Sequence, residues 1–154
     1  MQHHLAQINI GRMIAPIDHP SVAAFAEALD RINAIADASP GFVWRLQTED
    51  GNATSIHAFD DPLLLVNMSV WESAEALRAY VYKTDHVGFL RQRREWFVPY
   101  DGPHMALWWI PAGTLPTVED GKAALGALAA DGPSPRAFTF NPTFPPPDSA
   151  RTAA

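Results

Sequence analysis

Two polar side chains interrupt the most apolar stretch of the chain, and they are its first candidates for chemistry. Residues 63–71 read LLLVNMSVW, in which Asn67 and Ser69 supply an amide and a hydroxyl among aliphatic neighbours. A buried amide must form hydrogen bonds, and a ligand in a pocket is one natural partner. A polar network that joins one sheet to another across a subunit interface is the alternative interpretation.

Other residues extend this polar set and supply possible pocket walls. Gln7 and Asn9 alternate with apolar residues in LAQINIGR, and Asn33 falls within the apolar stripe of a predicted helix. Aromatic walls suit a flat heteroaromatic or polyketide-like ligand, although core and interface packing also explains aromatic residues. The predicted substrate-binding set is Trp71, Tyr82, Trp96, Trp109, Ser69 and Asn33.

Titratable groups cluster after residue 83. His86 lies where the predicted helix breaks and could serve as a general base, or simply pack at a helix start. Arg91, Arg93 and Arg94 could reach a ligand carboxylate or phosphate, or form structural ion pairs. Arg45 has the same two interpretations. We take His86, Asn67 and Arg94 as the candidate catalytic residues.

Composition excludes several other classes of function. The chain has no cysteine and no HxH, HExxH or His-x₃-His spacing, so we predict no metal site. The net charge is −6 and no basic run exceeds two residues, which argues against a nucleic-acid partner. No apolar run approaches the length of a membrane span, and the first residues lack the pattern of a signal peptide. We therefore expect a cytoplasmic protein without a membrane partner.

Hydrophobic periodicity predicts the elements that hold these residues. Strands are predicted at residues 5–12, 42–46, 63–71 and 104–110, and helices at 20–38, 73–97 and 118–130. The helix at 73–97 should break or kink near residues 83–88, where Asp85 could cap a new segment and Gly88 weakens the helix. In the second strand, Phe42, Trp44 and Leu46 should share one face, opposite Val43 and Arg45.

The order of these elements predicts an α+β fold. It is that of a ferredoxin-like split βαβ domain, with a four-stranded antiparallel sheet and both helices on one face, spanning residues 4–130. Residues 131–154 should form an extended arm and tail, fastened by Phe138, Phe140 and Phe144 to the body or to a partner.

A homodimer is expected because two strands are apolar on both faces. Trp108 and Trp109 are adjacent and must point to opposite faces, and the two predicted helices cover only one. The sheet of a second copy would bury the other face and form a dimeric α/β barrel. The low share of charged residues, 18%, agrees with a surface covered in part by a partner subunit.

Longer segments resemble a known family. VWESAEALRAYVYKTDHVGFLRQRREWF and MALWWIPAGTLPTVEDG, with NAIADASPGFVWRL and AFTF, resemble an uncharacterised bacterial family of unknown function over residues 4–144. That family is grouped with the antibiotic-biosynthesis-monooxygenase-like dimeric α/β-barrel proteins. The resemblance implies the dimeric barrel fold and leaves the reaction unassigned, because proteins of one fold perform unrelated functions.

Three functions stay open. The first is a small-molecule enzyme or binding protein without a cofactor. If it is catalytic, the fold relatives suggest oxygenation, isomerisation or cyclisation of an aromatic or polyketide-like substrate. His86 would then be the base, and Asn67 and Arg94 would orient or polarise the substrate. The second is a haem-binding barrel with His86 as axial ligand, since some dimeric barrels bind haem through a helix histidine. The third is a dimeric structural or regulatory protein whose cleft is filled by its own C-terminal arm.

Overall fold

The computed structural model describes residues 2–15, 19–46, 63–83, 97–98, 103–140 and 143–147. In chain order the elements are β1 (His3–Met13), the 3-10 turn η1 (Pro20–Val22), α1 (Ala23–Ala38), β2 (Phe42–Arg45), β3 (Leu64–Trp71), α2 (Ala74–Lys83), β4 (Phe97–Val98), β5 (Met105–Pro111) and α5 (Val118–Asp131). In the described part of the chain, no helix is long and apolar enough to cross a membrane.

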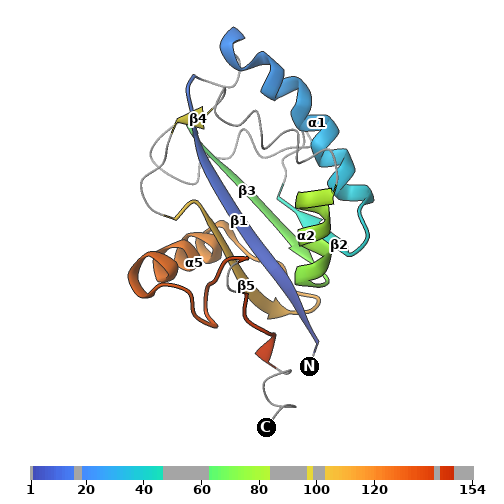
Figure 1. Ribbon diagram of the computed structural model, residues 1–154, viewed down its shortest axis with the longest axis vertical. Coiled ribbons are helices and arrows are strands. Elements are labelled where there is room, and N and C mark those ends of the chain that lie inside the picture. Colours follow the sequence, from blue (N-terminus) through green and yellow to red (C-terminus); the bar gives the residue numbers. More distant parts are fainter. Residues whose placement is uncertain are drawn as a thin grey trace.

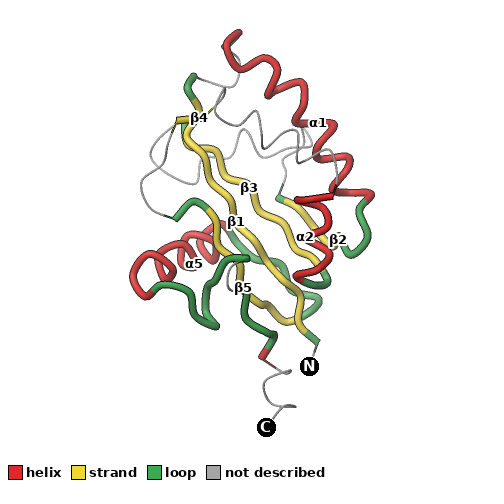
Figure 2. The backbone as a smooth tube through the Cα atoms, in the orientation of Figure 1, coloured by secondary structure: helices red, strands yellow, loops and turns green. Residues whose placement is uncertain are grey.

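The antiparallel sheet is built around β1 (Figures 1 and 2). β1 pairs with β3 from Leu5↔Trp71 to Arg12↔Leu64, and with β5 from His3↔Pro111 to Asn9↔Met105. β2 extends the sheet beyond β3, while the two-residue β4 pairs with the end of β1 at Met13. The strand order β2-β3-β1-β5 is that of a ferredoxin-like fold, and the predicted α+β class is confirmed.

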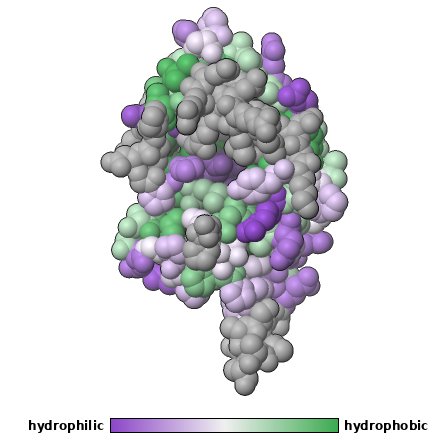
Figure 3. All heavy atoms as spheres, in the orientation of Figure 1, coloured by the Kyte–Doolittle hydropathy of each residue, from purple (hydrophilic) through white to green (hydrophobic). Residues whose placement is uncertain are grey.

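Helices α1 and α2 pack on the face of the sheet that carries Leu5, Gln7 and Trp71. Each helix packs apolar residues against the sheet, Phe25 and Ala36 from α1 and Leu77 from α2. Hydrophilic residues are visible on the right of Figure 3, the side where these helices lie. The sequence predicted one helix over residues 73–97. In the structure, the described part of α2 ends at Lys83, and Phe97 belongs to β4. The predicted break at residues 83–88 lies almost wholly outside the described residues.

The opposite face of the sheet is covered by α5 of the same chain. Ile8, Met68 and Trp108 are 0%, 0% and 9% exposed and form one core with Leu125 and Leu128 of α5. The argument that a second copy must cover this face is therefore wrong. The predicted helix at 118–130 exists, and its packing removes the need for a partner at these residues.

β2 contains a bulge that changes its side-chain pattern. The register shifts between Phe42 and Trp44, so Phe42 pairs with Trp71 while Arg45 pairs with Ser69. An inserted residue reverses the alternation of side chains beyond it. Phe42 and Arg45 consequently share the face under α1 and α2, and the predicted grouping of Phe42 with Trp44 is wrong.

The C-terminal segment adds to the edge of the sheet. Phe138 is 0% exposed and exchanges two backbone hydrogen bonds with Leu107 of β5, of 2.8 and 2.9 Å. Further along, the carbonyl of Phe144 accepts a hydrogen bond from Trp109 Nε1 at 2.8 Å. The predicted arm is thus anchored to β5 of its own chain at two points.

Candidate functional site

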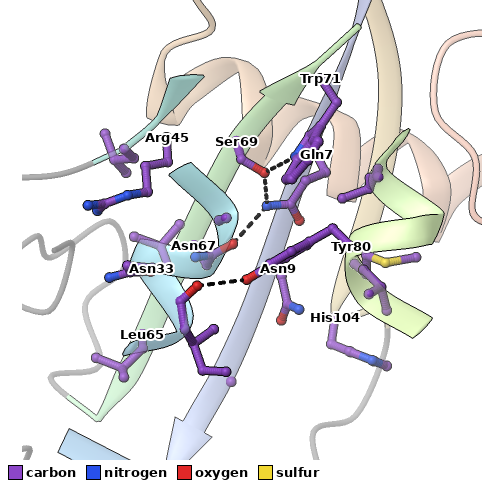
Figure 4. A pocket seen from close by; sticks show the side chains of 18 of the residues that line it. Gln7, Asn9, Asn33, Arg45, Leu65, Asn67, Ser69, Trp71, Tyr80 and His104 are labelled. Carbon is purple, nitrogen blue, oxygen red and sulfur yellow. Dashed lines mark hydrogen bonds between the residues drawn. The ribbon is translucent and has the colours of Figure 1, made fainter. Parts of the chain in front are cut away.

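A cavity of about 350 Å³ lies between the sheet and helices α1 and α2 (Figure 4). Pockets that bind small organic molecules are commonly of this size and combine apolar walls with a few placed polar groups. The polar and aromatic residues that line it are Gln7, Asn9, Phe25, Asn33, Arg45, Asn67, Ser69, Trp71, Tyr80, Tyr82, Phe97, His104 and Phe140.

The floor of the cavity is a row of hydrogen-bonded side chains on β1 and β3. Gln7 Nε2 donates to Asn67 Oδ1 over 2.7 Å and to Ser69 Oγ over 2.8 Å. Trp71 Nε1 also donates to Ser69 Oγ, over 2.8 Å. Because residues two apart on a strand share a face, the β1–β3 register places the whole row under α1 and α2.

Three carboxamides retain hydrogen-bonding groups that can reach a ligand. Asn67 is exposed although it lies on a central strand, because its side chain borders the cavity. Asn9 is half-buried and Asn33 is 8% exposed, and neither side chain forms a hydrogen bond with another described residue. The cavity therefore offers amide donors and acceptors from the sheet and from α1.

One wall is aromatic and rigid. The ring of Tyr80 stacks on Trp71, with 5.1 Å between centroids and 27° between planes, and Phe42 meets Trp71 edge-on at 5.4 Å. The Tyr80 hydroxyl donates to the carbonyl of Ile32 over 3.4 Å, which connects α2 to α1. These contacts fix a flat apolar surface beside the amide row.

Burial raises the pKa of Tyr80 well above its ordinary value, the charge of Asp37 raises it further, and the guanidinium of Arg45 partly opposes both. The phenol therefore stays protonated at neutral pH, and it can donate or accept a hydrogen bond but cannot act as a base. Arg45 itself is held by Asp37, through bonds from Nε to Oδ1 at 2.8 Å and from Nη2 to Oδ2 at 3.2 Å. Its side chain is 11% exposed.

The predicted site residues separate into three groups. Asn67, Ser69, Asn33, Trp71 and Tyr82 all line the cavity. Trp109 does not: its indole is bonded to the C-terminal segment, so the prediction that it lines the pocket is wrong. The other three, His86, Arg94 and Trp96, lie outside the described residues, and their roles stay predictions.

Several lining residues were not predicted as part of the site, and Tyr80 and Phe140 are two of them. Tyr80 was visible as an aromatic residue on the helix stripe, but its stack on Trp71 depends on tertiary packing. Phe140 lies in the C-terminal segment, where only its apolar character signalled a contact with the body. Among the described residues, no group of three or more His, Cys, Asp or Glu side chains could hold a metal ion.

A family model described as "Domain of unknown function (DUF3291)" matches residues 4–154. The chain belongs to this family. The resemblance found in its sequence segments is thereby confirmed, and the match covers nearly the whole of this chain. No curated protein matches the chain.

Solved structures also resemble this DUF3291 protein. NE2512, a protein of unknown function from Nitrosomonas europaea, shares 14% identity with a TM-score of 0.51, over 75% of this chain and 97% of its own. SnoaB, a cofactor-independent oxygenase from Streptomyces nogalater, shares 20% identity with a TM-score of 0.48, over 74% and 98%. The monooxygenase ActVA-Orf6 of Streptomyces coelicolor, solved with nanaomycin D, shares 20% identity with a TM-score of 0.43, over 75% and 94%.

Proposed function

We propose that the cavity binds a small, flat organic molecule that carries a carbonyl or hydroxyl oxygen. The observation that carries the proposal is the amide–hydroxyl row on β1 and β3, set beside the stacked rings of Trp71 and Tyr80. Because Trp71 is fully buried, the ring surface available to the aromatic body of a ligand is that of Tyr80, which Trp71 holds in place, and the row favours the polar edge of the ligand.

The polarity of the row indicates which ligand atom it favours. Ser69 Oγ accepts from both Trp71 and Gln7, which leaves its hydroxyl hydrogen to donate elsewhere. Asn67 Oδ1 accepts from Gln7, so both hydrogens of its amide nitrogen remain available. The row thus offers donors, and donors select an oxygen that accepts hydrogen bonds.

For a catalytic role we propose cofactor-free chemistry on such a ligand: oxygenation with molecular oxygen, isomerisation or cyclisation of an aromatic or polyketide-like substrate. Donors aimed at a carbonyl oxygen stabilise the negative charge that develops when a neighbouring carbon loses a proton. His86 keeps its predicted role as the base that removes this proton. Among the described residues that line the cavity, His104 also carries an imidazole.

The test uses matched pairs of compounds with and without a ketone: 1-indanone and indane, 1-tetralone and tetralin, fluorenone and fluorene. The wild-type protein should bind the ketone of at least one pair about tenfold more tightly, as for one good hydrogen bond to a desolvated acceptor. Asn67→Leu should remove this preference and leave the hydrocarbon affinity. Gln2→Leu, which changes an exposed amide before β1, is the control. Equal affinities within every pair, or a preference that survives in Asn67→Leu, would contradict the proposal.

The haem hypothesis depends on His86 and needs a separate test. Haem added to the purified protein should produce a Soret band that His86→Ala removes if His86 is the axial ligand. A spectrum equal to that of free haem would reject this hypothesis. The ketone preference would not be affected by that result.

Pairing into a homodimer is also proposed. The low share of charged residues, 18%, supports it. Light scattering of the purified protein should give twice the chain mass of 16.9 kDa. A mass equal to one chain would reject the dimer and leave the cavity proposal unchanged.

A further inference from the structure

Phe140, on the C-terminal segment, lines the cavity and packs against α2 instead of continuing along β5. Its ring meets that of Tyr82 at an angle of 64°, with 5.9 Å between centroids. Tyr82 is 56% exposed and also lines the cavity. These two rings therefore belong to the part of the lining that reaches solvent.

Arg78 holds Phe140 in this position by two contacts. Its Nη2 donates to the carbonyl of Phe140 over 3.0 Å, and its guanidinium lies 5.2 Å from the centre of the Phe140 ring. Arg78 and Tyr82 are four residues apart on α2 and so share one helix face. One helix face thus contacts both the backbone and the ring of Phe140.

The contacts of Phe140 are weaker than those that anchor the same segment at Phe138. Phe138, two residues earlier, is 0% exposed and bonded to Leu107 through its backbone. Phe140 is only partly buried at the margin of the same apolar cluster as Phe138, and its contacts with Arg78 and Tyr82 involve exposed side chains, where cation–π and hydrogen-bond energies are small. Phe140 can therefore leave α2 while Phe138 stays in the sheet, since local opening costs less than unfolding.

We propose that Phe140 narrows the cavity on the side beside α2 and limits the size of what enters there, and that Arg78 is the positioning residue that holds Phe140 in place. This inference goes beyond the proposed function, because it holds for any ligand of the cavity. It needs no ligand for its test.

The chain has no cysteine, so one introduced thiol can report on access to the cavity. Ala36→Cys places the thiol on α1 in the cavity lining, at a residue that is 5% exposed. Ala124→Cys places an equally buried thiol, 6% exposed in the parent chain, on α5 at the opposite face of the sheet. The rates of modification by methyl methanethiosulfonate and by the bulkier DTNB are measured in both backgrounds.

In the Ala36→Cys background, Phe140→Ala should raise the DTNB rate roughly tenfold and the rate of the smaller reagent by less. Arg78→Met, which keeps the apolar stem and removes the charge and the donor, should raise the DTNB rate roughly fivefold. Arg78→Lys should restore part of the protection. Arg136→Met, at an exposed arginine outside this cavity, should leave the rate unchanged.

An equal rise in the Ala36→Cys and Ala124→Cys backgrounds would show general unfolding and overturn the proposal. So would unchanged rates at the α1 thiol in both Phe140→Ala and Arg78→Met. Because Arg78 is exposed, Arg78→Met should fold normally and gives a decisive result even if Phe140→Ala does not fold.

Discussion

Trp71 Nε1 donates to Ser69 Oγ, two residues earlier on the same strand, over 2.8 Å. The indole is 0% exposed, and its nitrogen can only donate. Ser69 is therefore the group that lets β3 bury a tryptophan beneath α2. Ser69 Oγ also accepts a hydrogen bond from Gln7. One atom therefore orients both the polar row on the floor of the cavity and the Trp71 ring of its aromatic wall.

Ser69→Ala should lower the free energy of unfolding by about 1–3 kcal/mol, because it leaves a buried indole N–H without a partner. Urea unfolding followed by circular dichroism measures this loss. Ser21→Ala, at an exposed serine, is the control and should change the stability by less than about 0.5 kcal/mol. Trp71→Phe in the Ser69→Ala background should cost less than in the wild type, since the unpaired donor is then absent. Additive losses would show that this hydrogen bond does not contribute.

Tyr80 should make the protein less stable at high pH. Burial raises the pKa of Tyr80 in the folded state, whereas the unfolded chain releases the proton near the ordinary value of about 10. Above that pH the unfolded state binds fewer protons than the folded state, so stability falls as the pH rises further. The slope is about 1.4 kcal/mol per pH unit for one such group.

Tyr80→Phe should remove this part of the pH dependence. Urea midpoints between pH 9 and pH 11.5 measure it in both proteins, and Tyr82→Phe is the matched control at an exposed tyrosine. Parallel curves for Tyr80→Phe and wild type would contradict the assignment of the raised pKa to Tyr80.

The sequence predicted the elements that have strong periodicity. The run at 63–71 is a central strand because it is apolar on both faces, and the amides at residues 7, 33 and 67 do meet at one cavity. These polar residues within apolar patterns were an informative signal, because their side chains border the cavity.

The features that the sequence did not predict depend on local insertions and on packing. One extra residue in β2 directs Arg45 toward the cavity, and a four-residue strand is too short to reveal a bulge by its pattern. The covering of the second face by α5 was also missed, because periodicity identifies an apolar stripe without identifying what it packs against. Trp108 and Trp109 do point to opposite faces, but their partners are α5 and the C-terminal segment.

Phe138 should be the main anchor of the C-terminal segment. Phe138→Ala should lower the unfolding free energy by about 3–5 kcal/mol, as for a fully buried phenylalanine. Phe144→Ala, at a partly buried residue, should cost clearly less, and its backbone bond to Trp109 can persist. Chemical denaturation of both variants checks this order, which equal losses would refute.

Two glycines of α5 provide a test of how this helix packs on the sheet. A Cβ at Gly121 would lie 2.6 Å from Ile8 Cδ1 and 3.3 Å from Met68 Sδ, whereas a Cβ at Gly126 meets nothing within 4 Å. Both substitutions to alanine gain about 1 kcal/mol of helix propensity. At Gly121 the gain is opposed because Ile8 and Met68 are fully buried and must shift, and overpacking of this kind costs about 1–3 kcal/mol.

Gly126→Ala should therefore raise the unfolding free energy by about 1 kcal/mol, while Gly121→Ala should leave it unchanged or lower it. Thermal and urea unfolding of the two variants measure the difference directly. Equal stabilisation by both would mean that α5 does not lie against Ile8 and Met68. The second face of the sheet would then need another cover, and a second copy of the chain would again be the simplest one.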